Sequence, residues 1–166
     1  MRESKIVNEI IIIKNKLHQN TDKMFKTEVV CDPIVPLVNF DVATFAGTWY
    51  EQQHVKDPQE PTYYQCSTAQ YTGLTQDEDP DMKDFKVYNS FQTKTFGIWT
   101  PRIGVHAKAK CDTSANCYVS FFGKAVPEPN LHVLETDYTG YAINYDCEPS
   151  EGIVRLWINT REPVVS

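Results

Sequence analysis

Cysteines are the residues of this sequence whose type and spacing most plainly suggest chemistry. Zinc sites bring cysteines and histidines together at short, repeated spacings, and the sequence has neither such a spacing nor a Cys-x-x-Cys pair. A disulfide framework with one cysteine left over fits the count better, and it favours an oxidising compartment. The five cysteines are Cys31, Cys66, Cys111, Cys117 and Cys147.

The other residue types that carry catalysis or bind metals form no constellation in the sequence. The histidines (His18, His54, His106 and His132) are scattered without an i, i+4 pair, so we expect each at the surface or at a strand edge. The acidic run "QDEDPDMKD" at 76–84 lacks the glycine and the final glutamate of a calcium loop, which favours a solvated turn. There is no nucleophile elbow, phosphate loop or dinucleotide fingerprint. We therefore expect no metal, no cofactor and no enzymatic activity.

Composition limits the class of protein further. The 166 residues carry a net charge of −6 and show no basic stripe, which argues against nucleic acid as a partner. The longest apolar run is "IIII" at 10–13, far short of the roughly 18 residues of a membrane span. The first residues include acidic side chains and too short an apolar centre for an ordinary signal peptide. Cysteine usage nevertheless predicts a secreted or lumenal protein.

The elements that must position these residues fall into two parts. Residues 1–30 form an N-terminal extension in which Ile6, Ile10, Ile13 and Leu17 recur at helical spacing, so an amphipathic helix or a frayed extension is expected. Residues 31–166 form the main domain. It contains eight short β-type runs separated by Gly, Pro, Asp and Asn, at 48–53, 63–71, 85–92, 103–110, 117–124, 131–137, 141–147 and 152–160.

Short connections between these runs predict neighbouring antiparallel strands. Eight such strands close into an up-and-down barrel that can hold one small ligand. A two-sheet Greek-key sandwich is the alternative, but it needs a long return connection that the second half of the chain lacks. Before the first strand, Asp41 is a plausible N-cap, Phe45 an apolar anchor and Gly47 a terminator that tolerates positive φ. Trp49 then enters the sheet where it can plug one end.

Three stretches of the sequence resemble the three signatures of the lipocalin family, in the family's order. They are "NFDVATFAGTWY" at 39–50, "TDYTGYA" at 136–142 and "LWINTREP" at 156–163, and the resemblance covers roughly residues 31–163. Within the family the sequence is most similar to the apolipoprotein D and bilin-binding branch, through "KVYN" at 86–89 and "NYDCE" at 144–148.

The resemblance implies an all-β fold, an eight-stranded antiparallel up-and-down lipocalin barrel with an N-terminal extension. In the family, the first-signature Trp packs across the closed end of the barrel and the third-signature Arg lies against its face. Lipocalins usually continue into a helix on the barrel wall, and we expect this chain to lack that C-terminal helix. The barrel wall would then either be left bare or be covered by the N-terminal segment or a protein partner. The residues given a structural role are Gly47, Trp49, Thr136, Asp137, Tyr138 and Arg161.

The resemblance also bears on the cysteines. It implies a bridge between Cys31 and Cys147, and Cys111 and Cys117 would form a local hairpin bridge around "DTSAN". Cys66 loses its usual partner in the C-terminal tail and becomes the odd thiol. One prostaglandin-isomerising lipocalin uses a cavity cysteine, but alternation turns Cys66 outward, away from any substrate.

Alternation along the strands, combined with the resemblance, gives the residues expected to face the interior. Most are apolar, with Asn89, Arg155 and Glu135 as polar handles, although the same side chains could simply fill a small barrel. The expected ligand-binding residues are Ser67, Ala69, Tyr71, Val87, Asn89, Phe91, Val105, Ala107, Val119, Phe121, Leu131, Val133, Arg155 and Trp157.

The function expected from this reading is the binding and transport or sequestration of a small hydrophobic ligand inside the barrel. The ligand would be a lipid, sterol, retinoid or bilin. The alternative is a lipocalin-fold structural or interaction subunit of a larger assembly, and a small-molecule isomerase is the weaker third hypothesis.

Overall fold

The computed structural model describes residues 30–31, 33–35, 37–55, 65–76 and 83–164. The chain divides into two compact units, Met1–Val30 and Cys31–Ser166, and the elements described below all belong to the second. The helix expected over residues 6–17 and most of the acidic run at 76–84 lie outside the described residues.

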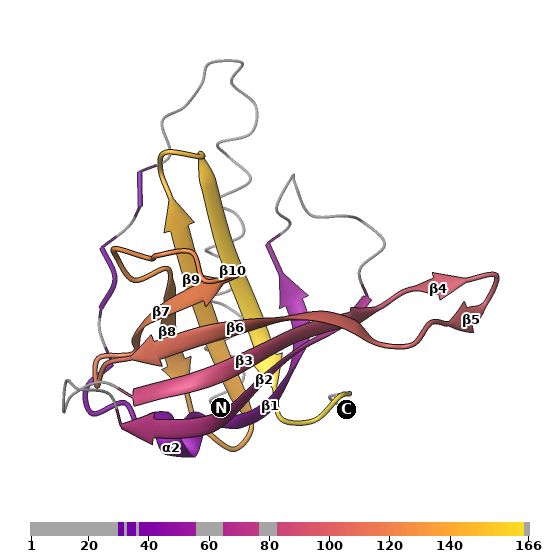
Figure 1. Ribbon diagram of the computed structural model, residues 1–166, viewed down its shortest axis with the longest axis horizontal. Helices are drawn as coiled ribbons and strands as arrows, with labels where there is room; N and C mark the ends of the chain where they lie inside the picture. Colours follow the sequence, from indigo (N-terminus) through magenta and orange to yellow (C-terminus); the bar gives the residue numbers. More distant parts are fainter. Residues whose placement is uncertain (1–29, 32, 36, 56–64, 77–82, 165–166) are drawn as a thin grey trace, which may run out of the picture. The chain divides into compact units, whose positions relative to one another are not determined.

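The described part of the chain is almost entirely β (Figure 1). One short helix, α2 (Val42–Phe45), precedes the first strand. The strands are β1 (Gly47–His54), β2 (Gln65–Gln76), β3 (Lys83–Gln92), β4 (Lys94–Thr95), β5 (Ile98–Trp99), β6 (Ile103–Cys111), β7 (Asn116–Phe121), β8 (Leu131–Thr136), β9 (Tyr141–Glu148) and β10 (Ile153–Thr160).

Eight of these strands form a closed barrel in the order β1-β10-β9-β8-β7-β6-β3-β2. Every neighbouring pair is antiparallel. The eight-stranded up-and-down barrel is therefore confirmed, and the Greek-key sandwich is not formed. The chain follows this order because its connections are short and each strand pairs with the next one along the sequence.

The alternating strand directions gather the connections at two ends of the barrel. The helix α2 and the turns 112–115 and 137–140 lie at one end, which we call the closed end. The connections 122–130 and 149–152 lie at the opposite end, which we call the mouth. In Figure 1 the closed end is at the bottom, beside α2, and the β9–β10 turn is at the top.

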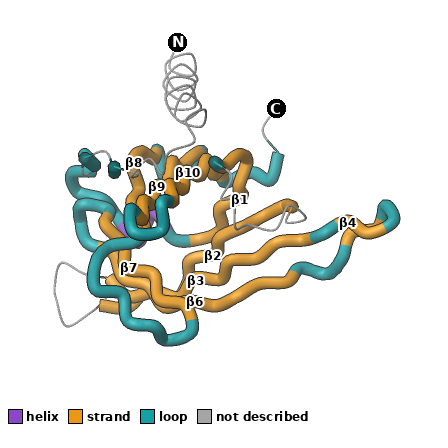
Figure 2. Tube along the Cα trace, turned by 90° about the horizontal axis from the view of Figure 1, so that it is seen from above, coloured by secondary structure: helices purple, strands orange, loops and turns teal. Residues whose placement is uncertain are grey.

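A hairpin that the sequence did not predict links β3 to β6. Strands β4 and β5 pair as a separate two-stranded sheet, and Figures 1 and 2 show it projecting beyond the barrel. Thr93 and Thr100 close its base, because the Thr100 amide donates to the Thr93 carbonyl at 2.9 Å and the Thr93 amide to the Thr100 hydroxyl at 3.0 Å. Its tip is apolar, and Phe96 is 100% exposed.

Register shifts interrupt the alternation of faces on three strands, β1, β2 and β8. On β1 the ladder shifts between Glu51 and Gln53, so that His54 pairs with Trp157. On β8 it shifts between Val133 and Glu135, so that Glu135 pairs with Ile143 rather than with an inward residue. Glu135 therefore lies on the outer face, where it accepts a 2.5 Å hydrogen bond from the Tyr141 hydroxyl. Its expected inward position is wrong, because the extra residue of a bulge breaks the alternation.

Candidate functional site

The closed end is sealed by a packed aromatic cluster around α2. Asp41 caps the helix, since its Oδ1 accepts from the Ala43 amide at 2.9 Å and the Thr44 amide at 3.2 Å, as the sequence predicted. Phe45 packs on Trp49 with 4.9 Å between ring centroids, and the Trp49 indole N–H donates to the Phe45 carbonyl at 2.9 Å. Trp49 has no exposed surface, so solvent does not reach the interior past it.

Arg161 stacks on the ring of the same tryptophan. Its guanidinium carbon is 3.7 Å from the centroid of the Trp49 ring, which is a close cation–π contact. The same group donates to the carbonyls of Tyr138 at 2.9 Å, Thr48 at 3.1 Å and Phe45 at 3.1 Å. The contact between Trp49 and Arg161 that the signatures imply is therefore present, and it joins the start of β1 to the end of β10.

Burial changes along the inner face from the closed end to the mouth. On β3, Phe85 and Val87 are buried, whereas Asn89 and Phe91 further along the strand are only partly buried. The strands β2, β6 and β7 show the same gradient, with Tyr71, Ala107, Ala109 and Val119 buried and Ala69, Val105 and Phe121 partly exposed. The interior is therefore closely packed near α2 and accessible to solvent towards the mouth.

Strand register shows which residues expected in the site share the inner face. Trp49 pairs with Ala69, Ala69 with Asn89 and Asn89 with Val105, and directly paired residues lie on one face of a sheet. The remaining pairs on this face are Tyr71 with Val87, Val87 with Ala107, Ala107 with Phe121, Phe91 with Ile103, Ala109 with Val119 and Cys117 with Leu131. Ser67 lies in the shifted segment between Gln65 and Thr68, so no pair fixes its face.

The interior near β1, β9 and β10 is more polar than the sequence predicted. His54 Nδ1 lies 2.5 Å from Glu51 Oε1, and both residues pair with inward positions of β10. Arg155 donates to Asp146 at 2.7 Å, and these two residues also face each other in the ladder. His54 is thus turned inward rather than to the surface, because the β1 bulge reverses its face. Arg155 already has a carboxylate partner, so a ligand carboxylate would compete with Asp146 for it.

Sequence reasoning missed two inward amides, Asn144 and Asn159. Asn144 on β9 pairs with Val133 and Trp157 and is only 4% exposed. Alternation was the signal that could have found it, since Ala142, Asn144 and Asp146 occupy every second position of β9. Asn159 on β10 is also buried on this face, since it pairs with Ala142 and Glu51. Tyr71 is buried in the lining as well, and burial raises the pKa of Tyr71 to about 12.

The structure contains both expected disulfides. Cys31 is bonded to Cys147 across a sequence separation of 116 residues, and Cys111 to Cys117 across six. Cys66 is the free cysteine of the described chain and is exposed. Its carbonyl accepts a 2.8 Å hydrogen bond from Arg102, which fixes the shifted segment of β2.

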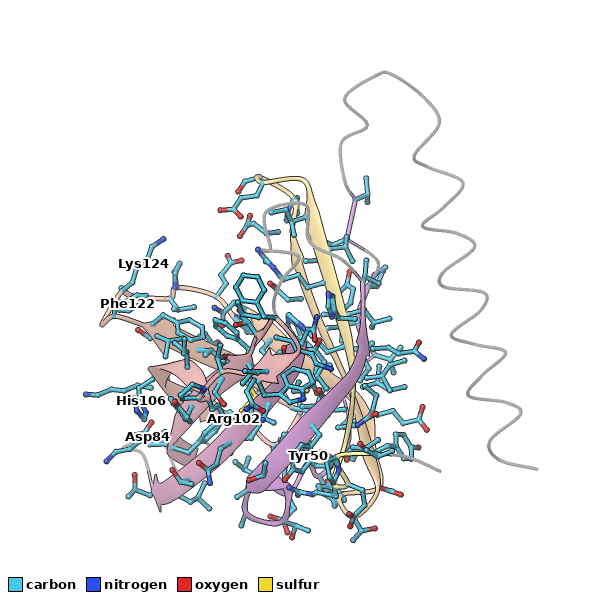
Figure 3. All side chains as sticks on the ribbon, turned by 90° about the vertical axis from the view of Figure 1, so that its right-hand side faces the viewer. Tyr50, Asp84, Arg102, His106, Phe122 and Lys124 are labelled. Atoms are coloured by element: carbon cyan, nitrogen blue, oxygen red, sulfur yellow. A yellow bond between two sulfur atoms is a disulfide. The ribbon has the colours of Figure 1, made fainter. Side chains whose placement is uncertain are left out.

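The mouth is bordered by exposed connections. Figure 3 shows Phe122 and Lys124, which follow β7, with their side chains directed away from the barrel. Among the described residues, no group of three or more His, Cys, Asp or Glu side chains is arranged to hold a metal ion. In the same part of the chain, none of the helices has the length and apolar character needed to cross a membrane.

Comparison with known proteins places this fold and interior in a family. No family model matches the chain. Insecticyanin-A of Manduca sexta is 31% identical over 141 residues, which are 81% of this chain and 70% of the relative. Purpurin of Gallus gallus is 31% identical over 116 residues, which are 66% of this chain and 56% of the relative. The solved structure of insecticyanin from the tobacco hornworm Manduca sexta has a TM-score of 0.62 at 26% identity, covering 84% of this chain and 73% of that one.

The chain belongs to the lipocalin family, and within it to the bilin-binding branch that the sequence indicated. Lipocalins bind small hydrophobic ligands in the barrel cavity, and this chain shares that binding function. A role as a structural subunit with a filled barrel is not favoured.

Proposed function

We propose that the ligand enters the barrel through the mouth and lies in its mouth half, among Ala69, Phe91, Val105 and Phe121. The chain would carry or sequester this ligand in a secreted or lumenal compartment, and it would do no chemistry on it. The burial gradient carries the proposal, because the inner faces of β2, β3, β6 and β7 are filled near α2 and remain accessible towards the mouth.

Apolar burial would supply most of the affinity. A ligand that covers the partly exposed aromatic and aliphatic side chains removes apolar area from water at roughly 25 cal/mol per Å². The closed end contributes by blocking passage, since Trp49 is fully buried beneath Arg161. The two disulfides support an oxidising compartment. The exposed position of Cys66 on the bulge of β2 supports a binding role without thiol catalysis.

Two substitutions on neighbouring positions of β2 test the location of the site. Ala69→Phe fills the inner face beside Asn89, and Gln70→Phe adds the same ring to the exposed outer face. We expect Ala69→Phe to abolish uptake of a fluorescent fatty acid or retinol while Gln70→Phe leaves it unchanged. Equal uptake by both variants would contradict a site in the interior.

Native mass spectrometry of protein purified from its own source tests the function more directly. A discrete mass that is lost on denaturation would identify the ligand. A protein that is found empty, and that takes up neither a fatty acid nor a retinoid, would contradict the carrier role.

A further inference from the structure

The β4–β5 hairpin carries a group of exposed apolar side chains beyond the barrel. Phe96 is fully exposed, Ile98 is 74% exposed and Trp99 is 45% exposed. Figures 1 and 2 show the hairpin projecting from the rest of the sheet. Single apolar side chains are common on protein surfaces, but a contiguous group of them indicates an interaction site. The hairpin tip therefore indicates a partner that removes these side chains from water.

The apolar side chains surround the tip of the hairpin instead of lining one face of it. Across the hairpin, Trp99 pairs with Lys94. The neighbouring Ile98 pairs with Thr95. Because successive residues of a strand point to opposite faces, Trp99 and Ile98 lie on opposite faces of the hairpin, and Phe96 lies in the turn between the strands. A flat protein surface would cover one of these faces, whereas a fluid apolar phase would surround the whole tip.

The hairpin is a structured element with an anchored base. Phe96 has φ of +50° and Gly97 has φ of +83°, as in the tight two-residue turns that connect antiparallel strands. At the base, Arg102 donates to the Cys66 carbonyl at 2.8 Å and to the Thr68 hydroxyl at 3.0 Å. The fold has therefore already ordered the hairpin, and its tip would lose little conformational entropy on binding.

The charges of the hairpin favour an anionic partner. The charged side chains of residues 93–102 are Lys94 and Arg102, in a chain whose net charge is −6. The Lys94 ammonium nitrogen lies 5.4 Å from the centroid of the Trp99 ring, so a positive charge stands beside the apolar tip. Tryptophan and lysine are typical of the membrane–water interface, where the ring lies at headgroup level and the ammonium reaches phosphate. A second copy docked through the same hairpin would instead bring like charges together.

We propose that the β4–β5 hairpin docks the protein on an anionic lipid bilayer. Phe96, Ile98 and Trp99 enter the interfacial region, and Lys94 lies at the level of the lipid phosphates. The apolar surface continues from the hairpin to the mouth, because Ile103 at the mouth end of β6 is 57% exposed and pairs with Phe91 of the inner face. Docking would thus place the mouth of the barrel beside the bilayer. The contact does not depend on which ligand the barrel binds.

Flotation with lipid vesicles tests the proposal on the full chain without any cavity ligand. The vesicles contain equal parts of phosphatidylcholine and phosphatidylserine, and the partition coefficient is measured. Phe96→Ser and Ile98→Ser remove apolar side chains from the tip, and Lys94→Gln removes the charge. Phe122→Ser is the matched control, because Phe122 also precedes a glycine, has φ of +56° and is 90% exposed, but is the single exposed large apolar side chain of the described residues 121–130.

We expect Phe96→Ser and Ile98→Ser each to lower the partition coefficient about tenfold, because each removes an apolar side chain from the interface. Lys94→Gln should lower it about fivefold on these vesicles and leave it unchanged on pure phosphatidylcholine. Phe122→Ser should bind like the wild type. A wild-type chain that does not bind the vesicles would overturn the proposal. Equal weakening by Phe96→Ser and Phe122→Ser would overturn the assignment to the hairpin.

Two further measurements separate a bilayer from a second copy of the chain. Vesicles with brominated lipid chains should quench the fluorescence of Trp99, and Trp99→Phe should remove the quenched component. Trp49 should contribute nothing to this component, because it is fully buried. Without vesicles, size-exclusion chromatography should give the same elution volume for the wild type and Phe96→Ser. A wild-type dimer that Phe96→Ser converts to a monomer would assign the hairpin to a second copy and overturn the proposal.

Discussion

The guanidinium of Arg161 lies 3.7 Å from the centroid of the Trp49 ring, and this contact joins the first barrel strand to the end of the last. The residues are 112 positions apart in the sequence, so the contact forms only when the barrel has closed. It therefore connects a local sequence motif to the global fold.

Removing this guanidinium should destabilise the barrel strongly. We expect Arg161→Leu to lower the free energy of unfolding by about 2–4 kcal/mol, because the cation–π contact and the hydrogen bonds to backbone carbonyls are lost together. Arg161→Lys should recover only a small part of this lost stability, because an ammonium group cannot reproduce the planar, forked set of N–H donors of a guanidinium. Urea unfolding measures the free energy of unfolding of both variants. A lysine variant as stable as the wild type would contradict the role given to the guanidinium.

Gly47 should tolerate no side chain. Its φ is +111°, and a Cβ built there would lie 3.0 Å from Arg161 Nη1. We expect Gly47→Ala to cost about 2–3 kcal/mol through backbone strain and displacement of the guanidinium. Gly123→Ala is the control, because φ is +72° but a Cβ there would meet no atom within 4 Å. If urea unfolding gave the same loss of unfolding free energy for both variants, the contact between the new Cβ and Arg161 would contribute nothing to the destabilisation.

The two disulfides should contribute unequally to stability. The loop closed by Cys31–Cys147 is far longer than that closed by Cys111–Cys117. Loop-closure entropy gives about 5 kcal/mol for the first and about 2 kcal/mol for the second. Paired serine variants, compared by urea unfolding under oxidising conditions, should show this order. The reverse order would contradict it.

His132 should make the protein less stable in mild acid. Burial lowers the pKa of His132 below its ordinary 6.5, although Asp146 and Asp112 oppose this shift. The unfolded chain therefore binds the proton first, and stability falls as the pH drops from about 6.5 towards the folded-state pKa. His132→Gln should flatten this part of the stability profile, measured by thermal unfolding between pH 7 and 5. An unchanged profile would assign the effect to other groups.

The apolar tip of the β4–β5 hairpin should be dispensable for folding. Phe96 is fully exposed, so Phe96→Ser should change the free energy of unfolding by less than about 0.5 kcal/mol. Phe45→Ser, in the closed end, should cost about 3–5 kcal/mol. A large loss for Phe96→Ser in urea unfolding would mean that the hairpin packs on the barrel.

The sequence by itself determined the architecture of the described barrel. Eight alternating runs with short connections require neighbouring antiparallel strands, and three signatures mark the closed end. The Asp41 cap and the burial of Phe45 follow from local residue types and spacing, whereas the contact between Trp49 and Arg161 was implied only by the resemblance to the lipocalin signatures. These features are predictable because period-two alternation and capping chemistry act over a few residues.

Only the tertiary structure decided which polar side chains face the interior of the barrel and how they pair there. One extra residue in β1 turns His54 inward, and one in β8 turns Glu135 outward, and strict alternation cannot detect either bulge. The pairing of Arg155 with Asp146 depends on the register of β9 against β10. The opposition of Asn89 and Asn144 depends on closure, because only a closed ring of eight strands brings β3 and β9 to face each other across one interior.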